Sequence, residues 1–219
     1  MNRDQGAAQA PAIRRRGLCL VIAAPSGGGK GAITRALLEI EPALSLSVSM
    51  TTRKPRPGER DGVHYQFCDP AEFEAMVAAN GFLEYARVFG FNQYGSPRAP
   101  AEAALAAGRD VIFDIDWQGY RQLRAALPGD VVGVFLLPPS MAELERRLHD
   151  RAADAPEEIA RRMGTARAEI SHWPEFDHVA LNDRFEATLA QVRAILVAAR
   201  LNTARQVGLP EFVSSLSAE

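Results

Sequence analysis

The sequence predicts an α/β fold in which a mainly parallel sheet is covered by helices on both faces. Short, continuous apolar stretches alternate with helical patterns, as is typical of buried parallel strands and their connecting helices. The 219-residue chain is long enough for one domain with small insertions, and we see no repeat or linker that would mark a second one. Its 47% apolar and 24% charged residues are ordinary for a soluble protein.

The elements of the main sheet are predicted from apolar runs and from the residues that end them. Pro42 ends the first helix, and Gly108 ends the helix before the strand 110–116. Strands are expected at residues 18–24, 110–116, 131–137 and 178–181. Helices are expected at residues 33–41, 98–107, 118–127, 140–150, 156–172 and 184–204.

The segment 45–95 is richer in prolines and short strands, and we expect it to be an insertion on the main sheet. Alternation of apolar and polar residues indicates the strands, and prolines fix φ in the loop. The expected elements are strands at 45–49, 65–67 and 82–88, a loop at 51–59, a helix at 70–79 and a turn at 93–98.

The two ends of the chain are predicted to be tails. Residues 1–16 read as a disordered N-terminal tail and residues 208–219 as a C-terminal tail, which leaves 17–207 as the domain. The three arginines at 14–16 have two interpretations, a contact with nucleic acid or a solvated charge run, and the second is favoured.

Charge and cysteine content exclude several classes of protein. The net charge of −2 gives no general attraction to nucleic acid, and the apolar run 18–24 is too short to span a bilayer. Cys19 and Cys68 have no metal or redox spacing and are expected to be reduced thiols. We therefore expect a cytoplasmic protein without nucleic-acid or membrane partners.

A glycine cluster lies between the strand 18–24 and the first helix. Glycines let successive backbone N–H groups surround phosphate oxygens, and the helix N-terminus adds a positive dipole end. Lys30 would reach the β- and γ-phosphates. The candidate residues are Ala24, Pro25, Ser26, Gly27, Gly28, Gly29, Lys30 and Gly31. The alternative is a glycine-rich turn that binds nothing.

A second set of candidate phosphate ligands lies on the proline-stiffened loop. Arg53 and Arg56 follow Ser49 closely, and their planar guanidinium groups suit the paired oxygens of a phosphate. Tyr65 and Tyr94 would add hydroxyl donors to the same anion. Taken alone, this loop favours the alternative interpretation, in which its arginines are merely solvated.

Three carboxylates are candidates for a catalytic or recognition role. Glu84 lies on an alternating strand, where it would accept hydrogen bonds from guanine or simply face outward. Asp114 and Asp116 follow a buried apolar strand, in the position of the carboxylate that organises Mg²⁺ in phosphoryl-transfer enzymes. Asp114 would orient Mg²⁺ waters or arginines, and the alternative is a plain strand end.

Arginines gather on the two helices that follow the strand 131–137. Arg147 and Arg151 share a helix face, and Arg162 lies on the next helix beside Arg161. A helical hairpin rich in arginine is a candidate lid that brings positive charge to a transferring phosphoryl group. The alternative is a charged surface in which these arginines pair with Glu143, Glu145 and Glu158.

The order of these motifs is very similar to that of the guanylate kinase family, across residues 17–200. The matching segments are APSGGGKG, SVSMTTRKPRPGERDGVHYQF, FLEYARVFG, QYGSPR, DVIFDIDWQG, FLLPPS, LERRL and LND. The resemblance implies a P-loop nucleoside monophosphate kinase fold. It also implies a GMP-binding insertion at about 45–98 and a helical lid at about 147–163.

The resemblance also implies a role for each candidate. The residues implied to bind GMP are Ser49, Arg53, Arg56, Tyr65, Glu84, Tyr94, Ser96 and Asp116. The residues implied to bind ATP are those of the glycine loop and Asn182. The residues implied in catalysis are Lys30, Arg53, Arg147, Arg151, Arg162 and Asp114.

Three departures from the family pattern stand out. Gly31 replaces a Ser or Thr whose hydroxyl usually meets Mg²⁺, so no direct metal ligand is assigned. The segment 88–94 is one residue longer than the usual family form, which affects the alignment of Tyr94. In the lid, Ala152 and Ala153 stand where the family commonly has Gly and Thr.

The resemblance implies an enzyme that transfers the γ-phosphoryl group of ATP, with Mg²⁺, to GMP and that can form a homo-oligomer. Two alternatives remain. One is a non-catalytic guanylate-kinase-like binding module, against which the retained Lys30 and arginines argue. The other is a related ribose-phosphate kinase, against which Ser49, Glu84 and Asp116 argue.

Overall fold

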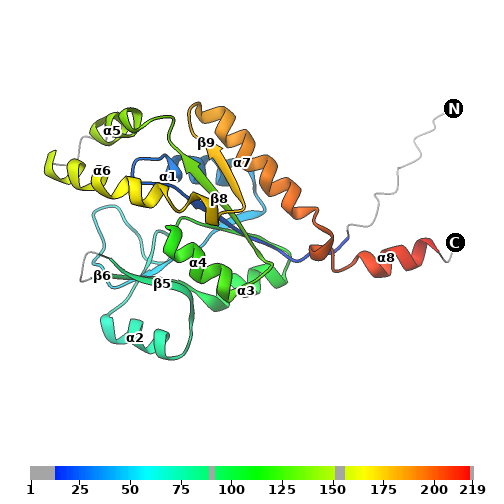
Figure 1. Ribbon diagram of the computed structural model, residues 1–219. Coiled ribbons are helices and arrows are strands. Elements are labelled where there is room, and N and C mark those ends of the chain that lie inside the picture. The colour runs from blue at the N-terminus through cyan, green and yellow to red at the C-terminus, as the bar shows by residue number, and fades with distance from the viewer. Residues whose placement is uncertain (1–12, 89–91, 151–155, 218–219) are drawn as a thin grey trace, which may run out of the picture.

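The computed structural model describes residues 13–88, 92–150 and 156–217, which form two sheets and their helices (Figure 1). The larger sheet is parallel, with strand order β2-β7-β1-β8-β9 among the described residues. Its strands are β1 (Cys19–Ala23), β2 (Leu44–Leu46), β7 (Asp110–Phe113), β8 (Val131–Leu137) and β9 (His178–Leu181). The predicted α/β fold with a mainly parallel sheet is confirmed.

Helices cover both faces of this sheet because β1 is buried on both sides. Cys19 and Val21 pack with the core beneath α3 and α4, whereas Leu20 and Ile22 pack with the core beneath α1 and α7. The helices are α1 (Lys30–Ile40), α3 (Arg98–Ala106), α4 (Trp117–Ala126), α5 (Met141–Asp150), α6 (Pro156–Ile170) and α7 (Phe185–Arg200). None of the helices in the described ranges is long and apolar enough to cross a membrane.

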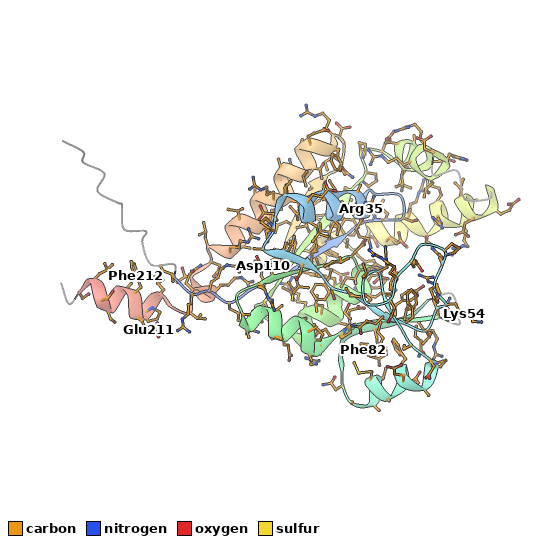
Figure 2. All side chains as sticks on the ribbon, turned by 180° about the vertical axis from the view of Figure 1, so that it is seen from behind. Arg35, Lys54, Phe82, Asp110, Glu211 and Phe212 are labelled. Atoms are coloured by element: carbon orange, nitrogen blue, oxygen red, sulfur yellow. The ribbon has the colours of Figure 1, made fainter. Side chains whose placement is uncertain are left out.

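The smaller sheet holds the predicted insertion and has strand order β4-β3-β6-β5. The helix α2 (Pro70–Ala78) packs on it through Phe73, which stacks on Phe82 with 4.6 Å between ring centroids (Figure 2). Its strands are β3 (Met50–Thr51), β4 (Gln66–Phe67), β5 (Phe82–Val88) and β6 (Asn92–Pro97). This sheet therefore has a small core of its own.

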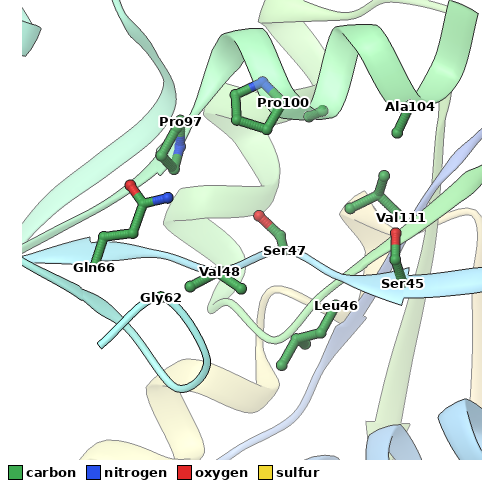
Figure 3. A pocket seen from close by; sticks show the side chains of 11 residues that line it. Ser45, Leu46, Ser47, Val48, Gly62, Gln66, Pro97, Pro100, Ala104 and Val111 are labelled. Atoms are coloured by element: carbon green, nitrogen blue, oxygen red, sulfur yellow. The ribbon is translucent and has the colours of Figure 1, made fainter. Parts of the chain in front are cut away.

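Side-chain hydrogen bonds and the chain itself join the smaller sheet to the rest of the fold. The side-chain amide of Gln122 on α4 accepts from the N–H of Tyr85 and donates to its C=O, both at 3.1 Å. The chain itself passes from β2 to β3 through residues 47–49. A cavity of about 190 Å³ lies beside this crossing, with Gln66 and Pro97 on one wall (Figure 3).

Three of the predicted elements in this part of the chain are wrong or have different bounds. Residues 93–97 are strand rather than turn, because Gly95 allows Phe82 to approach closely and so does not mark a turn, and Arg98 begins α3. The predicted strand 45–49 is strand only at 45–46, in β2, and residues 47–49 connect the two sheets. The predicted strand 110–116 ends at Phe113, because Asp116 instead caps α4.

The C-terminal part also differs from the prediction. The last predicted helix ends at Arg200 and is followed by a 3₁₀ turn, Thr203–Arg205. A further helix, α8 (Leu209–Leu216), occupies most of the predicted tail and leads away from the rest of the fold (Figure 1). Proline in its first turn begins this helix, a position that favours helix initiation.

Charged side chains form ion pairs where the strands of the larger sheet begin. Arg15 donates to both oxygens of the fully buried Asp110 at 2.7 and 2.8 Å, and Arg200 donates to the same carboxylate at 2.7 Å (Figure 2). Arg200 also donates to Glu41, and Arg16 pairs with Asp130. The interpretation of the arginines as a solvated run in a tail is therefore wrong for Arg15 and Arg16.

Candidate active site

The glycine loop connects β1 to α1 in a conformation that glycine permits. Gly27 and Gly29 have φ values of 85° and 92°, and Gly29 is the N-cap of α1. Asn182, which follows β9, donates from Nδ2 to the C=O of Gly28 at 2.8 Å. A Cβ on Gly29 would lie only 2.3 Å from the same Nδ2, so the loop and Asn182 fit closely together. The structure thus brings Asn182 to the loop, and its role in binding ATP stays a prediction.

Lys30 points from the start of α1 toward the end of β7. Its Nζ lies 2.7 Å from Oδ1 of Asp114 and donates to the C=O of Ile115 at 3.2 Å. The loop, Lys30 and Asp114 line a cleft of about 830 Å³. The predicted residues Arg56, Tyr65 and Asp116 line the same cleft. Candidates from both predicted phosphate sites therefore share one space.

Arg53 is held inside the smaller sheet by aromatic rings and one carboxylate. Its Nε donates to the Tyr94 hydroxyl at 3.1 Å, its Nη2 lies 2.9 Å from Glu59 Oε1, and its guanidinium lies 5.3 Å from the Tyr65 ring centroid. The other Glu59 oxygen accepts from the N–H of Arg56 at 2.7 Å. Sequence reasoning missed Glu59 as an organiser, although it ends the PRPGE segment.

Glu84 is buried beside α4. Its Oε1 accepts from the hydroxyl of the fully buried Ser96 at 2.6 Å, and burial, the largest influence, raises the pKa of Glu84 above its ordinary value. The interpretation of Glu84 as an outward-facing residue is wrong. Asp116 has a structural task as well, because its Oδ1 accepts from the N–H groups of Gln118 and Gly119, both at 2.9 Å.

Ser49 lies away from Glu84 in a smaller, neighbouring cleft. This cleft has a volume of about 320 Å³, and its lining includes Gly31, Tyr65 and Asp114. Tyr65 and Asp114 line both clefts and thus stand between them. In this structure Ser49 thus lines the smaller cleft and not the one that holds the glycine loop.

The predicted lid arginines are paired with carboxylates on their own helices. Arg147 lies 2.8 Å from Glu143 and also donates to the C=O of Asn182 at 3.0 Å, whereas Arg162 lies 2.8 Å from Glu158. Neither is among the described residues that line the 830 Å³ cleft. Arg151 lies outside the described residues. A catalytic role for these three arginines stays a prediction.

A second residue that sequence reasoning missed is Glu169, near the end of α6. Its Oε2 accepts from the N–H of Ser26 at 3.0 Å, so a helix of the predicted lid contacts the glycine loop. Glu169 also lines the cleft. No short motif contains it, and only the fold brings positions 26 and 169 together.

The cleft has oxygen donors that suit hydrated Mg²⁺ better than directly ligated Mg²⁺. Gly31 offers no hydroxyl, and Asp114 has one oxygen at Lys30 while its Oδ2 lies 3.8 Å from the position of a Cβ on Gly31. Mg²⁺ usually keeps several waters and is held by one or two carboxylates with phosphate oxygens. Asp114 is therefore the described residue that fits an Mg²⁺ ion brought by a nucleotide.

The fold and the cleft together define a P-loop nucleotide-binding protein with an inserted second sheet. A family model described as guanylate kinase matches residues 16–199. The chain is 61% identical to the guanylate kinase of Gluconobacter oxydans, over 94% of this chain and 98% of that one. It is 57% identical to that of Granulibacter bethesdensis, over 94% and 96%.

A solved structure agrees with these sequence matches. The crystal structure of guanylate kinase from Anaplasma phagocytophilum superposes with a TM-score of 0.75 at 36% identity, and covers 93% of this chain and 96% of that one. The chain belongs to the guanylate kinase family. The resemblance found in its motifs is confirmed.

Proposed function

We propose that this protein transfers the γ-phosphoryl group of ATP to GMP and produces ADP and GDP. The observation that carries the proposal is the shared cleft, where the glycine loop and Lys30 lie across from Arg56 and Tyr65. Two phosphate sites in one space suit a direct transfer between two nucleotides, with no covalent enzyme intermediate. The relatives named guanylate kinase support this reaction.

On the donor side, the glycine loop would bind the ATP phosphates. The backbone N–H groups at the start of α1 and the positive charge of Lys30 would bind the phosphate oxygens. Asn182 positions the loop through Gly28. The adenine would lie near Asn182, on the side where Arg147 contacts the Asn182 carbonyl.

On the acceptor side, the smaller sheet would bind GMP. Arg53, Arg56, Tyr65 and Tyr94 would hold its phosphate, and the first three already gather around Glu59 or one another. The Glu84 carboxylate would accept from the N1–H and N2 amino groups of guanine, and adenine lacks that amino group. Ser49, Ser96 and Asp116 would complete the base site.

Transfer itself would depend on position and charge. Lys30 and Asp114, which line the shared cleft, and Arg53 from the smaller sheet would stabilise the transferring group. Arg147, Arg151 and Arg162 would add charge if the helices α5 and α6 close. Mg²⁺ bound to ATP, held through waters at Asp114, would neutralise part of the phosphate charge. The homo-oligomer and the cytoplasmic location stay predictions.

An assay of ADP formation tests the reaction and its alternatives. Purified protein is given ATP and Mg²⁺ with GMP, AMP, UMP or ribose bisphosphate, and we expect turnover with GMP above all others. Folded protein that binds GMP without forming ADP would be a binding module. Turnover with ribose bisphosphate in preference to GMP would indicate the ribose-phosphate kinase.

A further inference from the structure

Gly31 leaves a space at the start of α1 that a side chain could fill. Its φ is not in the left-handed region, and a Cβ placed on it would make only ordinary contacts. Those contacts would be with Nη1 of Arg35 at 3.5 Å and with Oδ2 of Asp114 at 3.8 Å. The glycine is therefore not required by the backbone, and the position next to its missing side chain is occupied by a guanidinium.

Helix geometry explains why Arg35 reaches this point. Residues 31 and 35 are one turn apart on the same face of α1, and long helical side chains lean toward the N-terminus of their helix. Arg35 is exposed and lines both the 830 Å³ cleft and the smaller cleft beside it. Its position on α1 is visible in Figure 2.

The charge of Arg35 is not used within the part of the chain that the structure describes. No ion pair or side-chain hydrogen bond of Arg35 occurs among those residues, whereas Lys30 beside it is paired with Asp114. A guanidinium with free donors beside a phosphate loop is suited to bind phosphate oxygens, since each contact is charge-assisted.

We propose that Arg35 binds the β- and γ-phosphates of ATP from the side where a P-loop hydroxyl would otherwise hold Mg²⁺. The inference rests on the proposed function, because it assigns ATP to the glycine loop. Arg35 would thus supply positive charge at a point where Gly31 supplies no metal ligand. The nucleotide would then be held by the chain even in the absence of Mg²⁺.

The first experiment measures nucleotide binding without metal. The affinities of wild-type protein, Arg35→Met and Arg35→Lys for a non-hydrolysable ATP analogue are measured by calorimetry in EDTA. Methionine keeps the length and helix propensity of arginine but not the charge. We expect about a tenfold weaker affinity for Arg35→Met and an intermediate value for Arg35→Lys. Arg109→Ala, an exposed arginine before β7, is the control with unchanged affinity.

Measuring GMP affinity as well shows which of the two clefts lined by Arg35 uses its charge. GMP affinity should be the same in wild-type protein and Arg35→Met, because the proposal assigns Arg35 to ATP. A loss of GMP affinity with unchanged affinity for the ATP analogue would overturn the proposal and place Arg35 on the acceptor. Unchanged affinity for both ligands would also overturn it and leave Arg35 as a solvated side chain.

A double-mutant cycle tests whether Arg35 and the missing hydroxyl compete for one place. Gly31→Ser should lower the Mg²⁺ concentration for half-maximal activity severalfold in the Arg35→Met background. The effect should be smaller in the presence of Arg35, because the two groups are in contact and their effects are not additive. Additive effects would overturn the shared position. Failure of GMP turnover in the wild type would refute the proposed function but leave the metal-free binding result intact.

Discussion

Glu41 and Glu84 are buried to the same extent, 5% and 6% exposed, yet their surroundings shift their pKa values in opposite directions. Burial raises the pKa of both carboxyls, but hydrogen bonds from Arg193 and Arg200 outweigh it at Glu41 and lower its pKa. Glu84 has a neutral partner, the Ser96 hydroxyl, and its pKa stays raised. One carboxylate has its partners within the chain, whereas the other keeps acceptor capacity for a ligand.

The same contrast separates the two edges of the larger sheet. At the edge where the strands begin, Asp110 pairs with both Arg15 and Arg200. These ion pairs connect the N-terminal segment and the end of α7 to the sheet. At the edge where they end, Lys30 and Asp114 face an open cleft of about 830 Å³. Substitutions at the first edge should therefore act on stability, and substitutions at the second on binding and transfer.

The largest effect is expected for Lys30→Ala. The loss of a positive charge that contacts the transferring group should lower kcat by about 10³-fold, or ~4 kcal/mol of transition-state stabilisation. GMP affinity should change little, because Lys30 lies on the donor side. Steady-state kinetics and calorimetry with GMP measure the two quantities.

The matched control for Lys30→Ala is Lys54→Ala. Lys30 and Lys54 are the two lysines of the chain, and Lys54 is exposed on the loop beside Arg53 (Figure 2). We expect nearly wild-type kcat for Lys54→Ala. Equal losses of transfer and GMP binding in Lys30→Ala would contradict the assignment of Lys30 to ATP.

A smaller effect, on stability rather than on catalysis, is expected for Asp110→Asn. It leaves Arg15 without its counter-charge and Arg200 with Glu41 alone, which should lower the free energy of unfolding by about 3 kcal/mol. The kcat of the folded fraction should stay near the wild-type value. Urea denaturation measures the loss, and Arg109→Ala, an exposed neighbour, should change stability by less than about 0.5 kcal/mol.

Glu84→Gln should change both properties, in opposite directions. GMP affinity should fall about 100-fold, since a charged acceptor for two guanine N–H groups is lost. The free energy of unfolding without ligand should rise at neutral pH, because a buried charge is removed. Calorimetry with GMP and thermal denaturation without ligand measure the two changes.

The pH dependence of stability independently tests the predicted destabilisation by the buried Glu84 charge. The raised pKa of Glu84 means that the folded state holds the proton to higher pH than the unfolded state does. Wild-type stability should therefore decrease as pH rises from about 4.5 through the raised value, and Glu84→Gln should lack this decrease. The pH dependence from Glu41 is opposite in direction. Because its pKa is lowered, its contribution to stability is present above the ordinary pKa of a glutamate and is lost as pH falls through the lowered value.

The contrast between the edges also explains what the sequence could predict. The cleft residues lie in short motifs, such as the glycine loop with Lys30 and the segment after β7 with Asp114, so local patterns can identify them as candidates. The network at the opposite edge joins Arg15 to Asp110 and Asp110 to Arg200 across long stretches of chain. No local pattern pairs such distant charges, so the sequence alone predicts a solvated tail at the arginine run.

Within the site, the same limit separates identity from arrangement. Glu84 and Ser96 could be named from their motifs, but their contact depends on the register of β5 and β6. Gly95 looked like a turn residue because its role, close approach to Phe82, is a tertiary contact. Glu169 reaches Ser26 because α6 packs beside the loop, so no local sequence pattern indicates Glu169 as a site residue.

The smallest effect is expected for Asn182→Ala. The side chain of Asn182 contacts the glycine loop, and its backbone carbonyl accepts from Arg147 on α5. The substitution removes the hydrogen bond to Gly28 and should loosen the loop by about 1 kcal/mol, which raises KM for ATP roughly fivefold. The kcat should change less, because Lys30 and Asp114 keep their contact. Arg147 bonds to the backbone of Asn182 and is not removed by this change. If KM for GMP rose instead, Asn182 would belong to the acceptor side of the cleft.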